Sequence, residues 1–164
     1  MPYRICKIFE VESGHLLSKH PLYCRFPHGH TRKIEMVLES DTLDEREMVC
    51  DFQRVRHAAA DCIRALDHAL CMNTEDPNYA ALKKAFGERV LDFPGRDPTT
   101  EVIARRVYDS VAASLRGTRA EGAEAPLRRG VRLVSVRVWE TSSSWAEYAP
   151  AATGGRTRRI GVME

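Results

Sequence analysis

The stretch Cys24-Arg25-Phe26-Pro27-His28-Gly29-His30 leads into a run of alternating apolar residues that ends at Ser40. Residues two apart on an extended segment point to the same face, so His28 and His30 can approach one metal ion together. Gly29 lets the backbone come close without a side chain in the way. Cys24 precedes a Phe-Pro pair, which favours an extended turn over a helix. The alternative is two hydrogen-bonded surface histidines that flank a turn.

A third histidine extends this set. His15 follows a separate apolar segment, from which it could reach His28 and His30 across a strand pair. Three histidines with one open position form a ligand set typical of catalytic zinc. A thiol as close as Cys24 then suggests a reactive cysteine.

The composition narrows the class of protein. The 164 residues suggest one domain with a proper core, and 25 basic against 23 acidic residues give a formal charge of only +2. This balance offers no electrostatic reason to expect nucleic acid as a partner. No apolar stretch approaches the length of a signal peptide or membrane span, so we expect a soluble, cytoplasmic protein. The five irregularly spaced cysteines, with no Cys-x-x-Cys, indicate reduced thiols.

The first half of the chain predicts two strands and a helix. Residues 3–12 alternate apolar and polar positions, as does the run from 28 to 40, where Ile34, Met36 and Leu38 share the face of the two histidines. Asp51 is a good N-cap for a helix over 52–66. Residues 69–97 look irregular, with a short helix near 79–86.

The second half predicts a helix and two further strands. The helix begins at Asp97-Pro98, with Pro98 at its first position, and ends before Gly117. A Gly- and Arg-rich loop over 117–130 precedes strands at 131–139 and 144–149. Residues 1–152 then form one domain, and 153–164 a loose tail.

This order of two strands, two helices and two strands predicts an α+β fold. A four-stranded antiparallel sheet with both helices on one face would bury the apolar stripes. The sheet would leave long edges unpaired, so we expect an oligomer in which several sheets close into a barrel.

Six short motifs occur in a recognisable order up to Tyr148. They are Phe9 with His15, Cys24-x-x-x-His28-Gly29-His30, Asp51-Phe52, Leu66-Asp67-His68, Pro98-Thr99-Thr100-Glu101 and Glu140-Thr141. With them the chain resembles the family of 6-pyruvoyltetrahydropterin synthases and bacterial 6-carboxytetrahydropterin synthases. The resemblance implies the tunnelling fold, commonly a homo-hexamer of two trimers with shared active sites.

The resemblance also implies roles for site residues. His15, His28 and His30 match the zinc ligands, and Cys24 matches the cysteine that abstracts a proton. Asp67 and His68 match a proton-relaying dyad, which in the family comes from a neighbouring subunit. The alternative for His68 is an ordinary histidine at a helix C-terminus.

Glu140 matches the family's pterin anchor, because a carboxylate can accept two parallel hydrogen bonds from a pterin. Thr141, Thr99 and Thr100 would help to frame the ring, and Glu101 would add a polar contact. As alternatives, Thr99 or Thr100 caps the helix and Glu101 is an ordinary first-turn acid.

The chain departs from the family pattern in two places. The run Ser13-Gly14-His15-Leu16-Leu17 lacks an expected cation, and Asn73 comes later after the dyad than the family's Leu-Asn pair does. The candidates to contact a triphosphate are four cations, which could equally be solvated surface charges: Lys19, Arg25, Arg32 and Lys33.

The resemblance implies a zinc-dependent carbon–oxygen lyase. It would convert 7,8-dihydroneopterin triphosphate to 6-carboxy-5,6,7,8-tetrahydropterin, acetaldehyde and triphosphate for 7-deazaguanine (queuosine) synthesis. The short spacer Arg25-Phe26-Pro27 favours this carboxy-forming type over the alternative, a 6-pyruvoyltetrahydropterin synthase. An alternative of another class is a zinc-containing module that binds a pterin without turnover.

Overall fold

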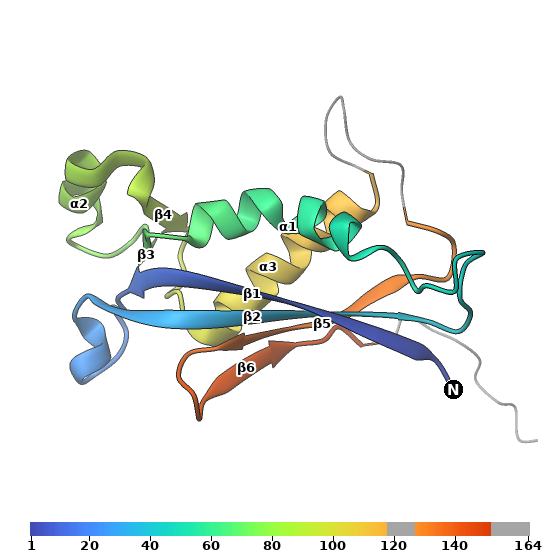
Figure 1. Cartoon of the computed structure of the whole chain (residues 1–164). Helices are drawn as coiled ribbons and strands as arrows, with labels where there is room; N and C mark the ends of the chain where they lie inside the picture. Colours follow the sequence, from blue (N-terminus) through green and yellow to red (C-terminus); the bar gives the residue numbers. More distant parts are fainter. Residues whose placement is uncertain (118–126, 152–164) are drawn as a thin grey trace, which may run out of the picture.

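The computed structural model describes residues 1–117 and 127–151, which form a sheet with helices across one face. The predicted strands are β1 (Tyr3–His15), β2 (His28–Ser40), β5 (Arg132–Trp139) and β6 (Trp145–Tyr148). They lie next to one another in that order and pair antiparallel. Helices α1 (Phe52–Leu66) and α3 (Thr100–Leu115) lie across one face (Figure 1). The predicted α+β class is confirmed.

The sheet is wider than predicted. It has six strands in the order β4-β3-β1-β2-β5-β6, because β3 (Ala69–Asn73) and β4 (Val90–Phe93) extend it parallel to β1. The prediction of four strands, with residues 69–97 mostly irregular, is therefore wrong. Both added strands are too short to show a periodic pattern, and pairing with distant residues stabilises them. The short helix predicted near 79–86 is confirmed as α2 (Tyr79–Phe86).

The two long helices begin at side-chain caps. Helix α1 has the predicted bounds, and the Asp51 carboxylate accepts a hydrogen bond from the Gln53 amide at 2.8 Å. Helix α3 begins at Thr100 rather than at Pro98, because the Thr99 hydroxyl accepts from the Val102 amide and acts as the N-cap. The Pro98 carbonyl is thereby left outside the helix and available to another partner.

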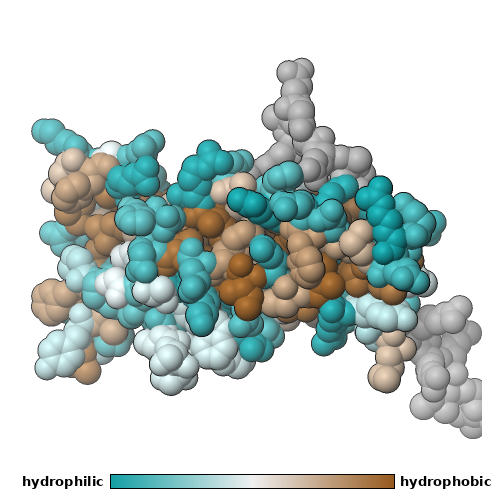
Figure 2. All heavy atoms as spheres, in the orientation of Figure 1, coloured by the Kyte–Doolittle hydropathy of each residue, from teal (hydrophilic) through white to brown (hydrophobic). Residues whose placement is uncertain are grey.

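The core lies between the sheet and these helices. Along α3, Ile103, Val107, Val111 and Leu115 are buried, as their helical spacing predicts. They pack with a larger cluster that includes Val11, Ile34, Met36, Leu38, Val55, Ala59, Val136 and Val138. Apolar side chains are visible along the seam between the helical layer and the sheet (Figure 2). Phe52, at the first turn of α1, is 49% exposed and lies outside this core.

Two predicted segments fall wholly or largely outside the described residues: most of the 117–130 loop, and the tail 153–164. Gly117 itself is described, with φ +69 after the last turn of α3, as a helix-terminating glycine should be. None of the helices within 1–117 and 127–151 combines the length and apolar character needed to cross a membrane.

The cap of α1 gives a testable contribution to stability. Asp51→Ala removes the hydrogen bond to the Gln53 amide, so we expect the free energy of unfolding to fall by about 1 kcal/mol. Asp51→Ser should retain most of it, because a serine hydroxyl can accept the same bond. Urea denaturation followed by circular dichroism measures both changes. Equal losses in the two variants would contradict the capping role.

Candidate metal centre and its surroundings

Three histidines converge at the end of the β1–β2 pair. The register of that pair places His15 opposite His28 and Ser13 opposite His30, so all three imidazoles share one face. The Nε2 atoms of His15 and His28 are 3.0 Å apart. One ligand atom from each of the three histidines lies within 4.8 Å of the others, a group that could hold a metal ion. The predicted convergence is confirmed.

Backbone carbonyls orient two of the rings. Nδ1 of His15 lies 2.8 Å from the Pro98 carbonyl oxygen, and Nδ1 of His28 lies 2.8 Å from that of Phe26. A carbonyl can only accept, so both Nδ1 atoms carry the proton and both Nε2 lone pairs face inward. Two lone pairs 3.0 Å apart repel unless a cation lies between them. The arrangement fits a zinc ion, which binds neutral imidazole nitrogens oriented by such outer contacts.

The third ring completes this donor set. Nε2 of His30 is buried and has no hydrogen-bond partner among the described residues. Burial, together with the nearby charge of Arg32, lowers the pKa of His30 and favours the neutral ring. A neutral imidazole with a buried, unpartnered nitrogen is a suitable metal ligand.

Glu140 lies beside the triad, in the turn that follows β5. Its Oε1 atom is 3.3 Å from His15 Nε2, 3.4 Å from His30 Nε2 and 3.8 Å from Arg32 Nη1. The adjacent His15 ring and the charge of Arg32 hold the pKa of Glu140 at about 2, against the raising effect of burial. The carboxylate is therefore ionised at neutral pH.

Arg32 is a part of the site whose burial its sequence did not predict. Its side chain is fully buried, whereas the sequence suggested a triphosphate contact or a solvated charge. Nε donates to the Ser13 hydroxyl at 3.1 Å, and Nη1 donates to the Thr100 hydroxyl at 3.3 Å. The alternation that turns His28 and His30 inward also turns residue 32 inward, and this was the available signal.

The other predicted contacts lie farther out. Thr99 caps α3, and the exposed Glu101 lies in its first turn, as their alternative interpretations predict. Thr100 is buried and bonds to Arg32. The exposed Thr141 faces Ser143, at 3.3 Å between the two hydroxyl oxygens. The role of these four residues as pterin contacts stays a prediction.

Cys24 and the Asp67–His68 dyad are not joined to the triad within the chain. Cys24 lies half-buried in the short 3-10 helix η1 (Tyr23–Arg25), and none of the hydrogen bonds between described residues involves its thiol. Asp67 follows the last residue of α1 and lies 3.2 Å from Nδ1 of His68. The Glu12 amide donates to the other Asp67 oxygen at 3.0 Å and is the main cause of the lowered pKa of Asp67.

The dyad opens onto the face of the sheet that is turned away from His15. His68, which is 73% exposed, lines a shallow groove of about 500 Å³. Glu12 and Thr31 also line it, and by strand alternation their side chains face away from the side on which His15 lies. His30 of the triad borders the same groove. No hydrogen bond or ion pair between described residues joins the dyad to His15, His28 or His30.

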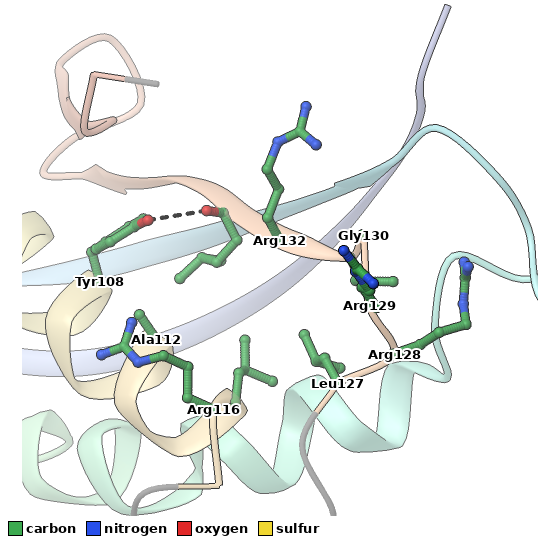
Figure 3. A pocket seen from close by; sticks show the side chains of 11 residues that line it. Tyr108, Ala112, Arg116, Leu127, Arg128, Arg129, Gly130 and Arg132 are labelled. Atoms are coloured by element: carbon green, nitrogen blue, oxygen red, sulfur yellow. Dashed lines mark hydrogen bonds between the residues drawn. The ribbon is translucent and has the colours of Figure 1, made fainter. Parts of the chain in front are cut away.

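A second cavity, of about 570 Å³, lies at the other end of the sheet (Figure 3). None of the described residues that line it is a histidine, a cysteine or a carboxylate. The Tyr108 hydroxyl donates to the Leu133 carbonyl, while Arg128 bonds to Thr42 and Arg132 pairs with Glu39. Arg128 and Arg132 extend from separate places in Figure 3, each toward its own partner.

Comparison with known proteins shows the family of the chain. The sequence model of the 6-pyruvoyl tetrahydropterin synthase family matches residues 4–151, and the chain belongs to that family. A 6-carboxy-5,6,7,8-tetrahydropterin synthase of Aquifex aeolicus is 34% identical over 90% of this chain and 98% of its own length. The enzyme of the same name from Haemophilus influenzae is 26% identical over 89% and 98%.

Solved structures share the fold. An uncharacterized protein of Wolinella succinogenes superposes with a TM-score of 0.73 at 23% identity, covering 91% of this chain and 98% of its own. The 6-pyruvoyl tetrahydropterin synthase of Caenorhabditis elegans gives a TM-score of 0.58 at 14% identity, covering 92% and 97%. The half-barrel sheet with helices is thus that of the family's known structures.

Proposed function

We propose that the chain is a zinc-dependent 6-carboxy-5,6,7,8-tetrahydropterin synthase, a carbon–oxygen lyase of 7-deazaguanine synthesis. It would act on 7,8-dihydroneopterin triphosphate and water, and release 6-carboxytetrahydropterin, acetaldehyde and triphosphate. The observation that carries the proposal is the histidine triad, with its nitrogen lone pairs turned inward beside an ionised Glu140. The two similar enzymes of this name, which align over nearly their full lengths, support it.

His15, His28 and His30 would hold the zinc ion. When bound, zinc supplies Lewis acidity, which makes C–H and O–H groups on a coordinated substrate side chain more acidic. Glu140 would anchor the pterin beside the triad, because its ionised carboxylate can accept hydrogen bonds from the ring N–H and amino groups. The substrate side chain would then extend toward the metal. Thr99, Thr100, Glu101 and Thr141 remain proposed outer contacts of the ring.

Cys24 would abstract the proton, with Asp67 and His68 of a second copy as its relay. Within one chain the dyad opens onto a groove that only His30 of the triad borders, and no hydrogen bond between described residues joins it to Cys24 or to the triad. The exposed apolar side chains of Tyr23 and Phe26 flank Cys24 and offer a surface for a second copy to cover. We therefore propose a homo-oligomer with shared sites, a hexamer of two trimers closed as a tunnelling-fold barrel.

The product distinguishes this proposal from its alternatives. We expect the zinc-loaded protein, given 7,8-dihydroneopterin triphosphate, to release acetaldehyde and leave a carboxyl group on the pterin. The three-residue spacer between Cys24 and His28 supports this outcome, because it fixes how far the thiol can reach along the substrate side chain. Mass spectrometry identifies the pterin, and NADH oxidation by alcohol dehydrogenase measures acetaldehyde. His57→Ala, on the exposed side of α1, is a matched control.

Two results would redirect the assignment. A pyruvoyl product without acetaldehyde would identify a 6-pyruvoyltetrahydropterin synthase. Bound zinc and bound pterin without any turnover would identify a binding module.

A further inference from the structure

Arg32 is a buried cation in contact with the candidate metal centre. It lies two residues after His30 on β2, and its side chain is fully buried. Burial lowers the pKa of its guanidinium, an effect that the nearby Glu140 carboxylate opposes. A buried arginine is stable only when its charge is compensated and its N–H groups are bonded. Ser13 and Thr100 supply neutral acceptors, and Glu140 supplies the compensating charge.

The position of Arg32 makes this compensation essential. Thr100 is the first residue of α3, so the guanidinium lies near the positive end of the helix dipole. Its Nη2 atom is also 3.2 Å from Nδ1 of His15. Because that nitrogen carries a proton for the Pro98 carbonyl, the contact is between two donors and adds no hydrogen bond. A divalent ion in the triad would add further positive charge.

Glu140 contacts Arg32 and the histidines through one of its two carboxylate oxygens. Oε1 makes all three inward contacts, to His15, His30 and Arg32. Oε1 is the nearer oxygen in each of these ion pairs, and no side-chain hydrogen bond between described residues involves Oε2. The side chain is 30% exposed, so the second oxygen is accessible to a ligand. The inner oxygen of the carboxylate therefore contacts the histidines and Arg32, and the outer oxygen can still accept a hydrogen bond from a ligand.

We propose that Arg32 is a positioning residue that fixes the Glu140 carboxylate beside the triad and offsets its charge. The pair sets the metal affinity of the triad, because both charges adjoin the same candidate ligand: Glu140 Oε1 is 3.3 Å from Nε2 of His15, and Arg32 Nη2 is 3.2 Å from its Nδ1. It also holds Oε2 toward the ligand, and this second part rests on the proposed function. The ligand class it selects has a fixed N–H donor, such as the 2-amino-4-oxopyrimidine edge of a pterin.

Zinc affinity tests the pair without any substrate. Arg32→Met removes a cation and leaves Glu140 uncompensated, so zinc should bind about tenfold more tightly. Glu140→Gln leaves Arg32 uncompensated and should weaken zinc binding by about tenfold. In the double variant the two changes should largely cancel. Competition with a chromophoric chelator measures all three, and Arg128→Met, which lies far from the triad, is the matched control.

The signs of these changes decide the proposal. If Arg32 only supported the fold, zinc should bind more weakly to Arg32→Met and more weakly still to the double variant. That result would contradict the proposal that Arg32 and Glu140 together set the zinc affinity. Arg32→Lys provides a second variant that keeps the charge, and it should bind zinc within about threefold of the parent. If Arg32→Lys instead behaved like Arg32→Met, the guanidinium charge would not be the cause.

Binding of neopterin, an unreactive pterin, tests the second part. In zinc-loaded protein, Arg32→Met and Arg32→Lys should each weaken neopterin binding about tenfold, because neither keeps the guanidinium that bonds to Ser13 and Thr100 and lies 3.8 Å from the Glu140 carboxylate. When Glu140→Gln is already present, adding Arg32→Met or Arg32→Lys should not lower the neopterin affinity further. Unchanged neopterin affinity in both single variants would overturn the positioning of Oε2. If the parent protein bound zinc but no neopterin, both the positioning of Oε2 and the proposed function would be wrong. Zinc affinities that change in opposite directions in Arg32→Met and Glu140→Gln would still support the effect of the Arg32–Glu140 pair on the metal.

Discussion

Cys24→Ala is expected to reduce turnover of 7,8-dihydroneopterin triphosphate by about 10²–10⁴-fold, the usual contribution of a general base. Zinc content and neopterin affinity should stay near those of the parent, because Cys24 makes no contact with the triad. The other thiols are poor substitutes. Burial raises the pKa of Cys71 to about 11, and burial also raises that of Cys50. Triphosphate release under single-turnover conditions measures the loss.

Mixed assemblies provide the control for this variant. If the base and its relay come from different chains, mixing Cys24→Ala with His68→Ala chains should restore part of the activity. Each mixed assembly would then contain some sites with an intact Cys24 facing an intact His68. Turnover by Cys24→Ala alone at the parental rate would make the thiol structural and disprove the mechanism.

The second large effect concerns the metal. His28→Ala should lower zinc affinity by more than about 100-fold, because it removes a ligand itself rather than one of the outer partners. The ring's remaining hydrogen bond is to the nearby Phe26 carbonyl, so the fold should survive. Metal analysis and circular dichroism of the purified variant measure both properties. His57→Ala should retain zinc, and equal zinc in His28→Ala and the parent would contradict the site.

The triad was predictable because it depends on local rules. Alternation along an extended strand is sufficient to turn His28 and His30 to the same face, and pairing of β1 with β2 brings in His15. The same rule applies to residue 32, yet an arginine is so rarely buried that its charge argued for the surface. Its partners Thr100 and Glu140 come from α3 and the turn after β5, which local patterns do not bring together.

The missed strands have a different cause. β3 and β4 have five and four residues, and each is stabilised by a parallel partner distant in sequence. Nothing local separates such segments from a loop. The start of α3 was predicted two residues too early, because a proline fits the first helical position as well as the position before the N-cap residue. The Thr99 hydroxyl decides between them.

The carbonyls that orient His15 and His28 belong to the main chain. Every amino acid supplies such an oxygen, so replacing the side chain of Phe26 or Pro98 leaves the acceptor in place. The tautomers of these two candidate metal ligands therefore do not depend on the side chains of Phe26 and Pro98. Side-chain scanning would pass over both positions, whereas inserting or deleting one residue beside either would move the acceptor and free the ring. Evolution can thus vary these side chains while the lengths of the two loops remain constrained.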